Sequence, residues 1–183
     1  MNLQCANPHR PDPLTVKDIS LESPVEEKID WAERVHCETG SRLSADPEIS
    51  SLVERFAAAV KASHRMMQEA GINEICRECD QREGGSCCGK GIENRYSGVM
   101  LLINLLMERP LPHRRFDPAG CFFLGPFGCS LLARHVICIN YICNKVTDSV
   151  SSEHLSCLRD CEGEELHVLF LLVETVKREL ISR

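Results

Sequence analysis

Aromatic side chains, long apolar runs and an excess of positive charge are all scarce in this sequence. One Trp, two Tyr and six Phe among 183 residues leave Leu, Ile, Val and Met to build a core. The longest apolar run, residues 99–107, contains Asn104 and is far shorter than the roughly 20 residues that span a bilayer. The 21 Lys and Arg against 27 Asp and Glu give a net charge of -6, so we expect no nucleic-acid partner and no membrane.

Familiar catalytic and targeting signatures are also missing. The sequence has no P-loop, no G-x-G-x-x-G after a strand, no H-E-x-x-H and no G-x-S-x-G. It lacks the cysteine spacing of bacterial ferredoxins. No catalytic residue can be assigned, and whether the protein is an enzyme stays open because many cysteines could form a Cys–His pair. The first residues lack the basic and apolar stretches of a secretory signal, so we expect a cytoplasmic protein.

The first 45 residues predict a flexible, poorly ordered N-terminal arm. Four prolines break any regular element there, and large apolar side chains are few. A short helix over residues 24–34 is an alternative, with Trp31 as an anchor onto the rest of the protein. We expect residues 46–183 to form a helical, cysteine-rich domain.

That domain begins with a strong helix signal. Asp46 can cap a helix, Pro47 fits its first position, and apolar residues recur at spacings of three and four up to residue 67. Gly71 is a suitable left-handed cap at the end. The pattern predicts an amphipathic helix of about six turns over residues 46–70.

Three further helices are predicted. Residues 97–108 are apolar almost all round and read as a buried helix that starts at Ser97. Residues 130–141 favour a helix, with a strand as the alternative because of their β-branched content. Residues 152–180 carry a long apolar stripe, in which Gly163 marks a kink or a break. The prediction is an all-α fold with a cysteine-rich loop region between helices.

Cysteine is the unusual component, because the chain has twelve and eight of them fall between residues 76 and 143. These eight are the candidate metal ligands: Cys76, Cys79, Cys87, Cys88, Cys121, Cys129, Cys138 and Cys143. In a reducing compartment, such clustering favours metal ligation over disulfides. The spacing of Cys76 and Cys79 is that of a two-ligand knuckle, in which each sulfur lies about 2.3 Å from zinc. Residues 46–183 are therefore expected to be a metal-binding domain.

Glycines and charges around these cysteines fit a thiolate site. Gly84, Gly85, Gly89 and Gly91 surround the vicinal pair Cys87–Cys88 and permit unusual turns. Residues 76–143 hold eight Lys or Arg against six Asp or Glu. Arg77, Arg82 and Arg134 are candidates to stabilise thiolates, with ordinary surface charge as the alternative.

The number of thiols leaves the metal open. Thiolates suit zinc and iron–sulfur clusters equally. Eight cysteines exceed one tetrahedral site, so either two four-thiolate centres exist, or one cluster takes four thiols and the others pack. Phe122, Phe123, Leu124 and Phe127 could shield a cluster from water or serve as core. We favour an iron–sulfur cluster of the 4Fe–4S type, with Zn²⁺ as the alternative.

The remaining candidate ligands are weaker. Cys157 and Cys161 would share one face of the last helix, where packing is the simpler interpretation. Cys5 and Cys37 fall in the predicted arm and are expected to be bystanders. His135 lies close to Cys138 and is the imidazole most worth testing. The basic loop 109–116 could contact an acidic protein partner, although a solvated loop is the simpler interpretation.

At these residues the sequence resembles the YkgJ-type family, a zinc- or iron-chelating domain known by its C-x-x-C…C-C pattern. The likeness rests on Cys76-Arg-Glu-Cys79 with the pair Cys87–Cys88. It continues in the Cys121-Phe-Phe-Leu block with Cys129, and in the segment from Arg134 to Cys138. It covers roughly residues 72–144. The gap from Cys79 to Cys87 is longer than the family's, and His135 stands where the family has Pro.

The resemblance implies metal binding, with zinc and iron–sulfur both represented. We expect a metal-binding protein that holds its metal through the clustered thiolates and acts in electron transfer or sensing. One alternative is an iron–sulfur-dependent enzyme that modifies a protein side chain, since the family includes relatives of flagellin lysine methylase. The other alternative is a zinc-stabilised interaction module.

Overall fold

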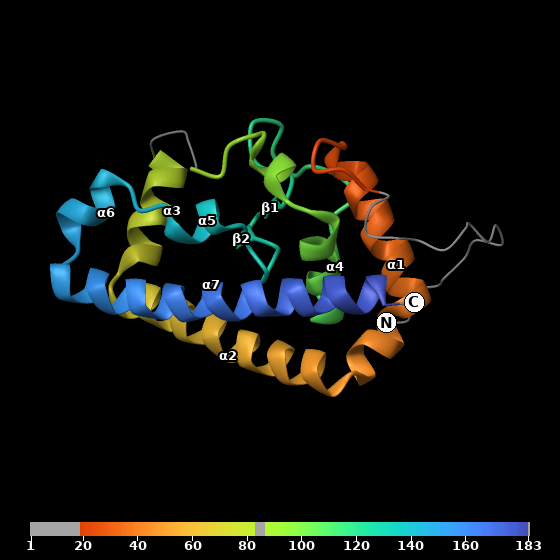
Figure 1. The fold of residues 1–183 in the computed structure, drawn as a ribbon. Helices are drawn as coiled ribbons and strands as arrows, with labels where there is room; N and C mark the ends of the chain where they lie inside the picture. Colours follow the sequence, from red (N-terminus) through yellow and green to blue (C-terminus); the bar gives the residue numbers. More distant parts are fainter. Residues whose placement is uncertain (1–18, 83–86, 183) are drawn as a thin grey trace.

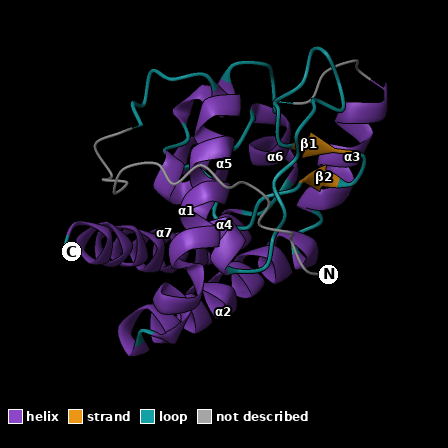
Figure 2. Ribbon diagram, turned by 90° about the vertical axis from the view of Figure 1, so that its right-hand side faces the viewer, coloured by secondary structure: helices purple, strands orange, loops and turns teal. Residues whose placement is uncertain are grey.

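The computed structural model describes residues 19–82 and 87–182, which are mostly helical (Figures 1 and 2). The helices are α1 (Val25–Ala45), α2 (Pro47–Glu69), α3 (Ile72–Arg82), the 3-10 helix η2 (Ile92–Arg95), α4 (Gly98–Leu106), α5 (Val136–Asn140), α6 (Asn144–Ser149) and α7 (Ser152–Ile181). Strands β1 (Leu124–Gly125) and β2 (Gly128–Cys129) pair into a small antiparallel hairpin. The all-α prediction is confirmed.

Helices α2 and α7 form the long base of the molecule and run side by side in opposite directions (Figure 1). The start of α2 follows the predicted signal, because the Asp46 carboxylate accepts hydrogen bonds from the backbone N–H groups of Glu48 and Ile49. Gly71 ends this segment with a φ of +72°, a left-handed conformation that suits glycine. Helix α7 continues through Gly163 without a break. None of the described helices has both the length and the hydropathy to cross a bilayer.

Helix α1 packs along α4 and belongs to the main core, which corrects the predicted arm for residues 25–45. Val25, Ile29 and Trp31 are almost fully buried there. The four prolines lie before this helix, so they do not interrupt it. The anchoring role expected of Trp31 is therefore played by a helix of about six turns rather than by a short segment. Residues 1–18, including Cys5, lie outside the described residues.

A second, smaller apolar cluster lies at the opposite end of the base. It is made by Ile72 of α3, Val146 and Val150 at α6, and Leu158 of α7. Helix α3 packs on α6 at this end, as Figure 1 shows. The cysteine-bearing segments between α3 and α6 therefore connect two separate apolar clusters.

The predicted cysteine-rich loop needs two corrections. Cys76 and Cys79 lie on α3, which is short and polar and gains its stability by packing Ile72 and Ile75 at the small cluster. In the predicted helix 130–141, only Val136–Asn140 is helical. Residues 130–135 are irregular because their backbone groups bond to a side chain of α4, described below.

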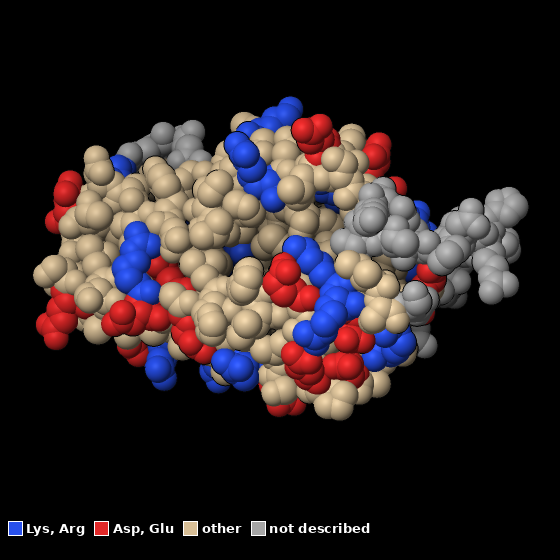
Figure 3. Space-filling view, viewed as in Figure 1, with Lys and Arg blue, Asp and Glu red and all other residues tan. Residues whose placement is uncertain are grey.

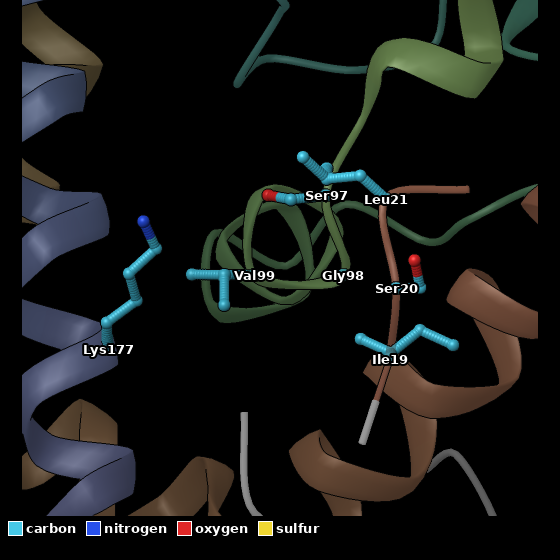
Figure 4. Close-up of a pocket in the computed structure, with 7 residues that line it drawn as sticks. All are labelled: Ile19, Ser20, Leu21, Ser97, Gly98, Val99 and Lys177. Carbon is cyan, nitrogen blue, oxygen red and sulfur yellow. The ribbon is translucent and has the colours of Figure 1, made fainter. Parts of the chain in front are cut away.

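A close contact between α1 and α4 fixes Gly98 at the start of α4. A Cβ atom placed on Gly98 would lie 2.5 Å from Cε3 of Trp31 and 3.0 Å from Cγ2 of Ile19. Beside this contact lies a pocket of about 180 Å³, to which Val99 and Lys177 contribute (Figure 4). It is lined by no Cys, His, Asp or Glu, so it offers none of the usual protein ligands of a transition metal.

We expect Gly98→Ala to lower the free energy of unfolding by about 1–3 kcal/mol, because its methyl group would overlap the Trp31 ring in a well-packed core. Gly163→Ala is the matched control, since a Cβ at this exposed position of α7 meets nothing within 4 Å. The control should be more stable by about 0.5–1 kcal/mol. Urea unfolding of both variants measures the difference, and equal effects at the two positions would contradict the packing described here.

Candidate metal centre

The eight predicted cysteines come from three regular elements and the segments between elements. Cys76 and Cys79 are three residues apart on α3, so they share one face of that helix. Cys129 lies on β2, Cys138 lies on α5, and Cys143 is the residue before α6. The other three, Cys87, Cys88 and Cys121, lie outside helices and strands.

Backbone hydrogen bonds join the segment of the vicinal pair to the segment before the hairpin. The N–H of Cys121 donates to the carbonyl of Cys88 at 2.7 Å. The next residues, Gly89 and Gly120, form an antiparallel β-bridge. These contacts bring Cys88 beside Cys121, 33 residues further along the chain.

Asn104 of α4 fixes the segment between Cys129 and Cys138. Its side chain is fully buried in an otherwise apolar helix. The amide nitrogen donates to the carbonyls of Met100 at 2.9 Å and Ala133 at 3.1 Å. The amide oxygen accepts from the backbone N–H groups of Leu132 at 2.8 Å and Ala133 at 3.0 Å. Three backbone groups of an irregular segment are thus satisfied by one side chain, which replaces the helix predicted there.

Tyr96 contacts the thiol of Cys138. Its ring is buried and meets Phe123 edge to face at 5.0 Å between centroids. Its hydroxyl accepts from the N–H of His135 at 3.1 Å and donates to Sγ of Cys138 at 3.7 Å. The His135 imidazole caps α5, because its Nδ1 accepts from the N–H of Ile137 at 3.2 Å. The structure thus gives His135 a helix-capping contact.

Glu93 and Arg115 hold the loop that precedes Cys121. Glu93 is buried on η2, and its carboxylate accepts hydrogen bonds from the Arg115 guanidinium and from the N–H of Gly91. Arg115 also donates to the carbonyl of Gly120. Burial alone would raise the pKa of Glu93, but these hydrogen bonds lower it below its usual value. Part of the basic loop 109–116 is therefore packed onto η2 by Arg115.

One group of thiols gathers where α3 meets α6. Burial raises the pKa of Cys76, and the thiolates of Cys143, Cys79 and Cys88 raise it further. The pKa of Cys87 is raised first by its hydrogen bond with the Cys88 thiol, then by burial and by the thiolates of Cys88, Cys76 and Cys143. Cys143 also packs against the small apolar cluster.

A second group of thiols gathers around the hairpin. Burial raises the pKa of Cys121 to about 11, with further increases from Glu93 and the thiolates of Cys129 and Cys88, against a hydrogen bond from the Phe123 backbone that lowers it. Surrounding protein desolvates the thiol of Cys129 although the residue as a whole is exposed, and Cys88 and Cys138 raise its pKa further. A hydrogen bond from the Leu131 backbone opposes this increase. Backbone N–H groups that bond to cysteine sulfur favour the thiolate that a metal requires.

Arg134 is the basic residue that acts on the second group. It lowers the pKa of Cys129 and of Cys138, in both cases against burial, which raises them. Its guanidinium lies 3.4 Å from Glu165, a fully buried residue of α7. Arg77, another candidate, instead pairs with Glu74 at 3.1 Å on the surface.

The donor chemistry fits a thiophilic metal, although the thiols are not yet arranged as ligands. Within residues 19–82 and 87–182, no group of three or more His, Cys, Asp or Glu side chains is placed to hold a metal ion. All eight thiols are nevertheless free of disulfides. Crowded thiols with raised pKa values repel one another as thiolates, and a bound cation relieves that repulsion. A metal would therefore have to draw neighbouring thiols closer together.

The apolar residues that were predicted either to shield a metal cluster from water or to serve as core do not lie together. Phe122 and Phe123 are buried in the main core, whereas Phe127 at the hairpin turn is fully exposed. Val136, Ile137 and Tyr141 are also exposed, on and after α5. On the face in Figure 3, charged side chains gather along the base, while the surface above α5 is mostly uncharged.

The other cysteines are separate from these two groups. Cys157 and Cys161 lie on α7 and are free thiols, with Cys157 exposed. Cys37 lies on α1 and is disulfide-bonded, so it has no thiol to offer a metal.

The residues that support the thiols, chiefly Tyr96, Asn104 and Glu93, could not be identified from their spacing in the sequence. A single Asn within the apolar run 99–107 is the one signal that could have revealed any of them.

Comparisons with known proteins leave the family open: no family model, no curated protein and no solved structure matches the chain. The resemblance to the YkgJ-type family therefore stays a prediction.

We expect Asn104→Ala to lower the free energy of unfolding by about 2–4 kcal/mol, because the N–H groups of Leu132 and Ala133 would lose their acceptor inside the protein, at about 1–3 kcal/mol for each unsatisfied group. Urea unfolding and amide hydrogen exchange at these two residues measure the effect. Asn94→Ala is the control, since the Asn94 side chain is exposed. A loss below about 0.5 kcal/mol would contradict the role of Asn104, because surface substitutions have effects of that size.

Proposed function

We propose that this protein binds a thiophilic metal through its clustered cysteines, as an iron–sulfur cluster or as Zn²⁺. The supporting observation is that eight cysteines spread over 68 residues lie in two neighbouring groups whose thiols act on one another, with none of the eight in a disulfide. Scattered core thiols would have no reason to converge. Zinc and iron–sulfur clusters are both held by four cysteine thiolates, so the proposal is thiolate ligation, whichever of the two is bound.

The support around the thiols also favours metal binding over simple packing. Backbone N–H groups of Phe123 and Leu131 and the hydroxyl of Tyr96 bond to three different cysteine sulfurs. Such contacts stabilise metal thiolates and tune the reduction potential of a cluster. A bound iron–sulfur cluster would supply one-electron redox chemistry suited to electron transfer or sensing.

A zinc-stabilised interaction module is the second candidate, and the exposed apolar side chains favour it. Phe127, Val136, Ile137 and Tyr141 belong to the same segment as Cys129, Cys138 and Cys143. Metal binding would hold that segment in shape, and its apolar side chains would then contact another protein. The identity of the metal separates the two candidates.

Purification without oxygen, followed by visible absorption and determination of Fe, Zn and acid-labile sulfide per chain, tests the proposal. Iron with matching sulfide and a brown colour would identify an iron–sulfur protein. Colourless protein with stoichiometric zinc would favour the interaction module. Folded protein with neither metal, which also takes up none on reconstitution with all thiols reduced, would contradict metal binding.

Two double variants, each lacking two thiols, serve as the test and its control. Cys76→Ser with Cys79→Ser removes two of the eight candidate ligands and should lower the metal content. Cys157→Ser with Cys161→Ser removes two free thiols of α7 and should leave it unchanged. The same metal content in both variants would exclude Cys76 and Cys79 from the site.

A further inference from the structure

The eight clustered cysteines divide according to the elements that hold them. Cys76 and Cys79 lie on α3, and α3 packs on α6, which Cys143 precedes. Ile75 and Ile142, the neighbours of Cys76 and Cys143, both pack against the small apolar cluster. These three cysteines therefore belong to one end of the molecule.

Three other cysteines belong to the hairpin and α5. Cys121 precedes β1, and Cys129 pairs with Leu124 across the hairpin. Cys138 reaches the same region through its bond to Tyr96, whose ring packs against Phe123. Cys121 and Phe123 are part of the main core rather than of the small cluster.

The vicinal pair lies between these groups, and its two thiols are hydrogen-bonded to each other. The carbonyl of Cys88 bonds to the N–H of Cys121, and the following Gly89 pairs with Gly120. The Cys87 thiol also interacts with Cys76 and Cys143 of the first group. Cys88 interacts with all three cysteines of the second group, and with Cys76 as well. Two adjacent cysteines would strain a single mononuclear site, whereas a pair between two groups of thiols can contribute one ligand to each.

We propose that the chain carries two separate four-thiolate metal centres, to which the pair Cys87–Cys88 contributes one ligand each. The first centre consists of Cys76, Cys79, Cys87 and Cys143. The second consists of Cys88, Cys121, Cys129 and Cys138. This inference rests on the proposed metal binding and deepens it. Zinc and 4Fe–4S clusters each take four cysteines, so two centres use all eight thiols.

The two centres have different structural consequences. The first joins α3 to α6 at the small cluster, so its loss should loosen that end and leave the main core intact. The second joins the hairpin and α5 to the segment of Cys88 beside the main core. Each centre can therefore be removed without the other.

Anaerobic titration of the reduced, metal-free full chain with Co²⁺ tests the inference, because cobalt–thiolate absorption reports each occupied centre. The natural sequence should bind two equivalents tightly. Cys76→Ser with Cys79→Ser should bind one, and Cys129→Ser with Cys138→Ser should also bind one. Cys87→Ser and Cys88→Ser should each lose one equivalent, whereas both together should lose two. The double variant at Cys157 and Cys161 is the control and should bind two.

Binding of only one equivalent of Co²⁺ by the natural sequence would contradict the two centres but not metal binding itself. So would complete loss of Co²⁺ binding in the double variant at Cys76 and Cys79 or in the one at Cys129 and Cys138. No cobalt binding at all would overturn the proposed function together with the two centres. Far-UV circular dichroism checks that each variant keeps its helices. Where a double variant does not, single substitution of the exposed Cys76 or Cys129 replaces it.

Discussion

The segment from Cys121 to Cys143 has little regular structure, so its backbone polar groups must find partners outside helices and sheets. Asn104 is the partner of three backbone groups of Leu132 and Ala133, and the Tyr96 hydroxyl accepts from the N–H of His135. Asn104 is buried on α4, and Tyr96 belongs to the main core. Residues of the main core therefore also determine the position of the segment between Cys129 and Cys138.

Local signals in the sequence explain which helices could be predicted. Asp46 and Ser97 are side-chain caps, and both helices begin where these residues predict. Helix α1 was predicted only as an alternative, and only over its first half, because its few apolar residues become informative only once α4 covers them. Helix α3 is short and depends on the small apolar cluster. Residues 130–135 have helical composition, but Asn104, far away in sequence, overrides it.

The candidate ligands could be predicted from clustering, whereas their grouping could not. Spacing indicates that Cys76 and Cys79 act together, because cysteines three positions apart lie close together on a helix or in a knuckle. It does not indicate that Cys143 joins them, since this depends on the packing of α3 against α6. Nor does it show that Cys87 lies beside Cys143 or that Cys88 lies beside Cys121. Long-range contacts decide both points.

X-ray absorption at the metal edge of the anaerobically purified protein tests the central claim most directly, because it reports the atoms bound to the metal. The account predicts a first shell of sulfur alone, at about 2.3 Å and about four sulfurs per metal. A first shell dominated by nitrogen or oxygen would show that the clustered thiols are not the ligands, and would contradict the account.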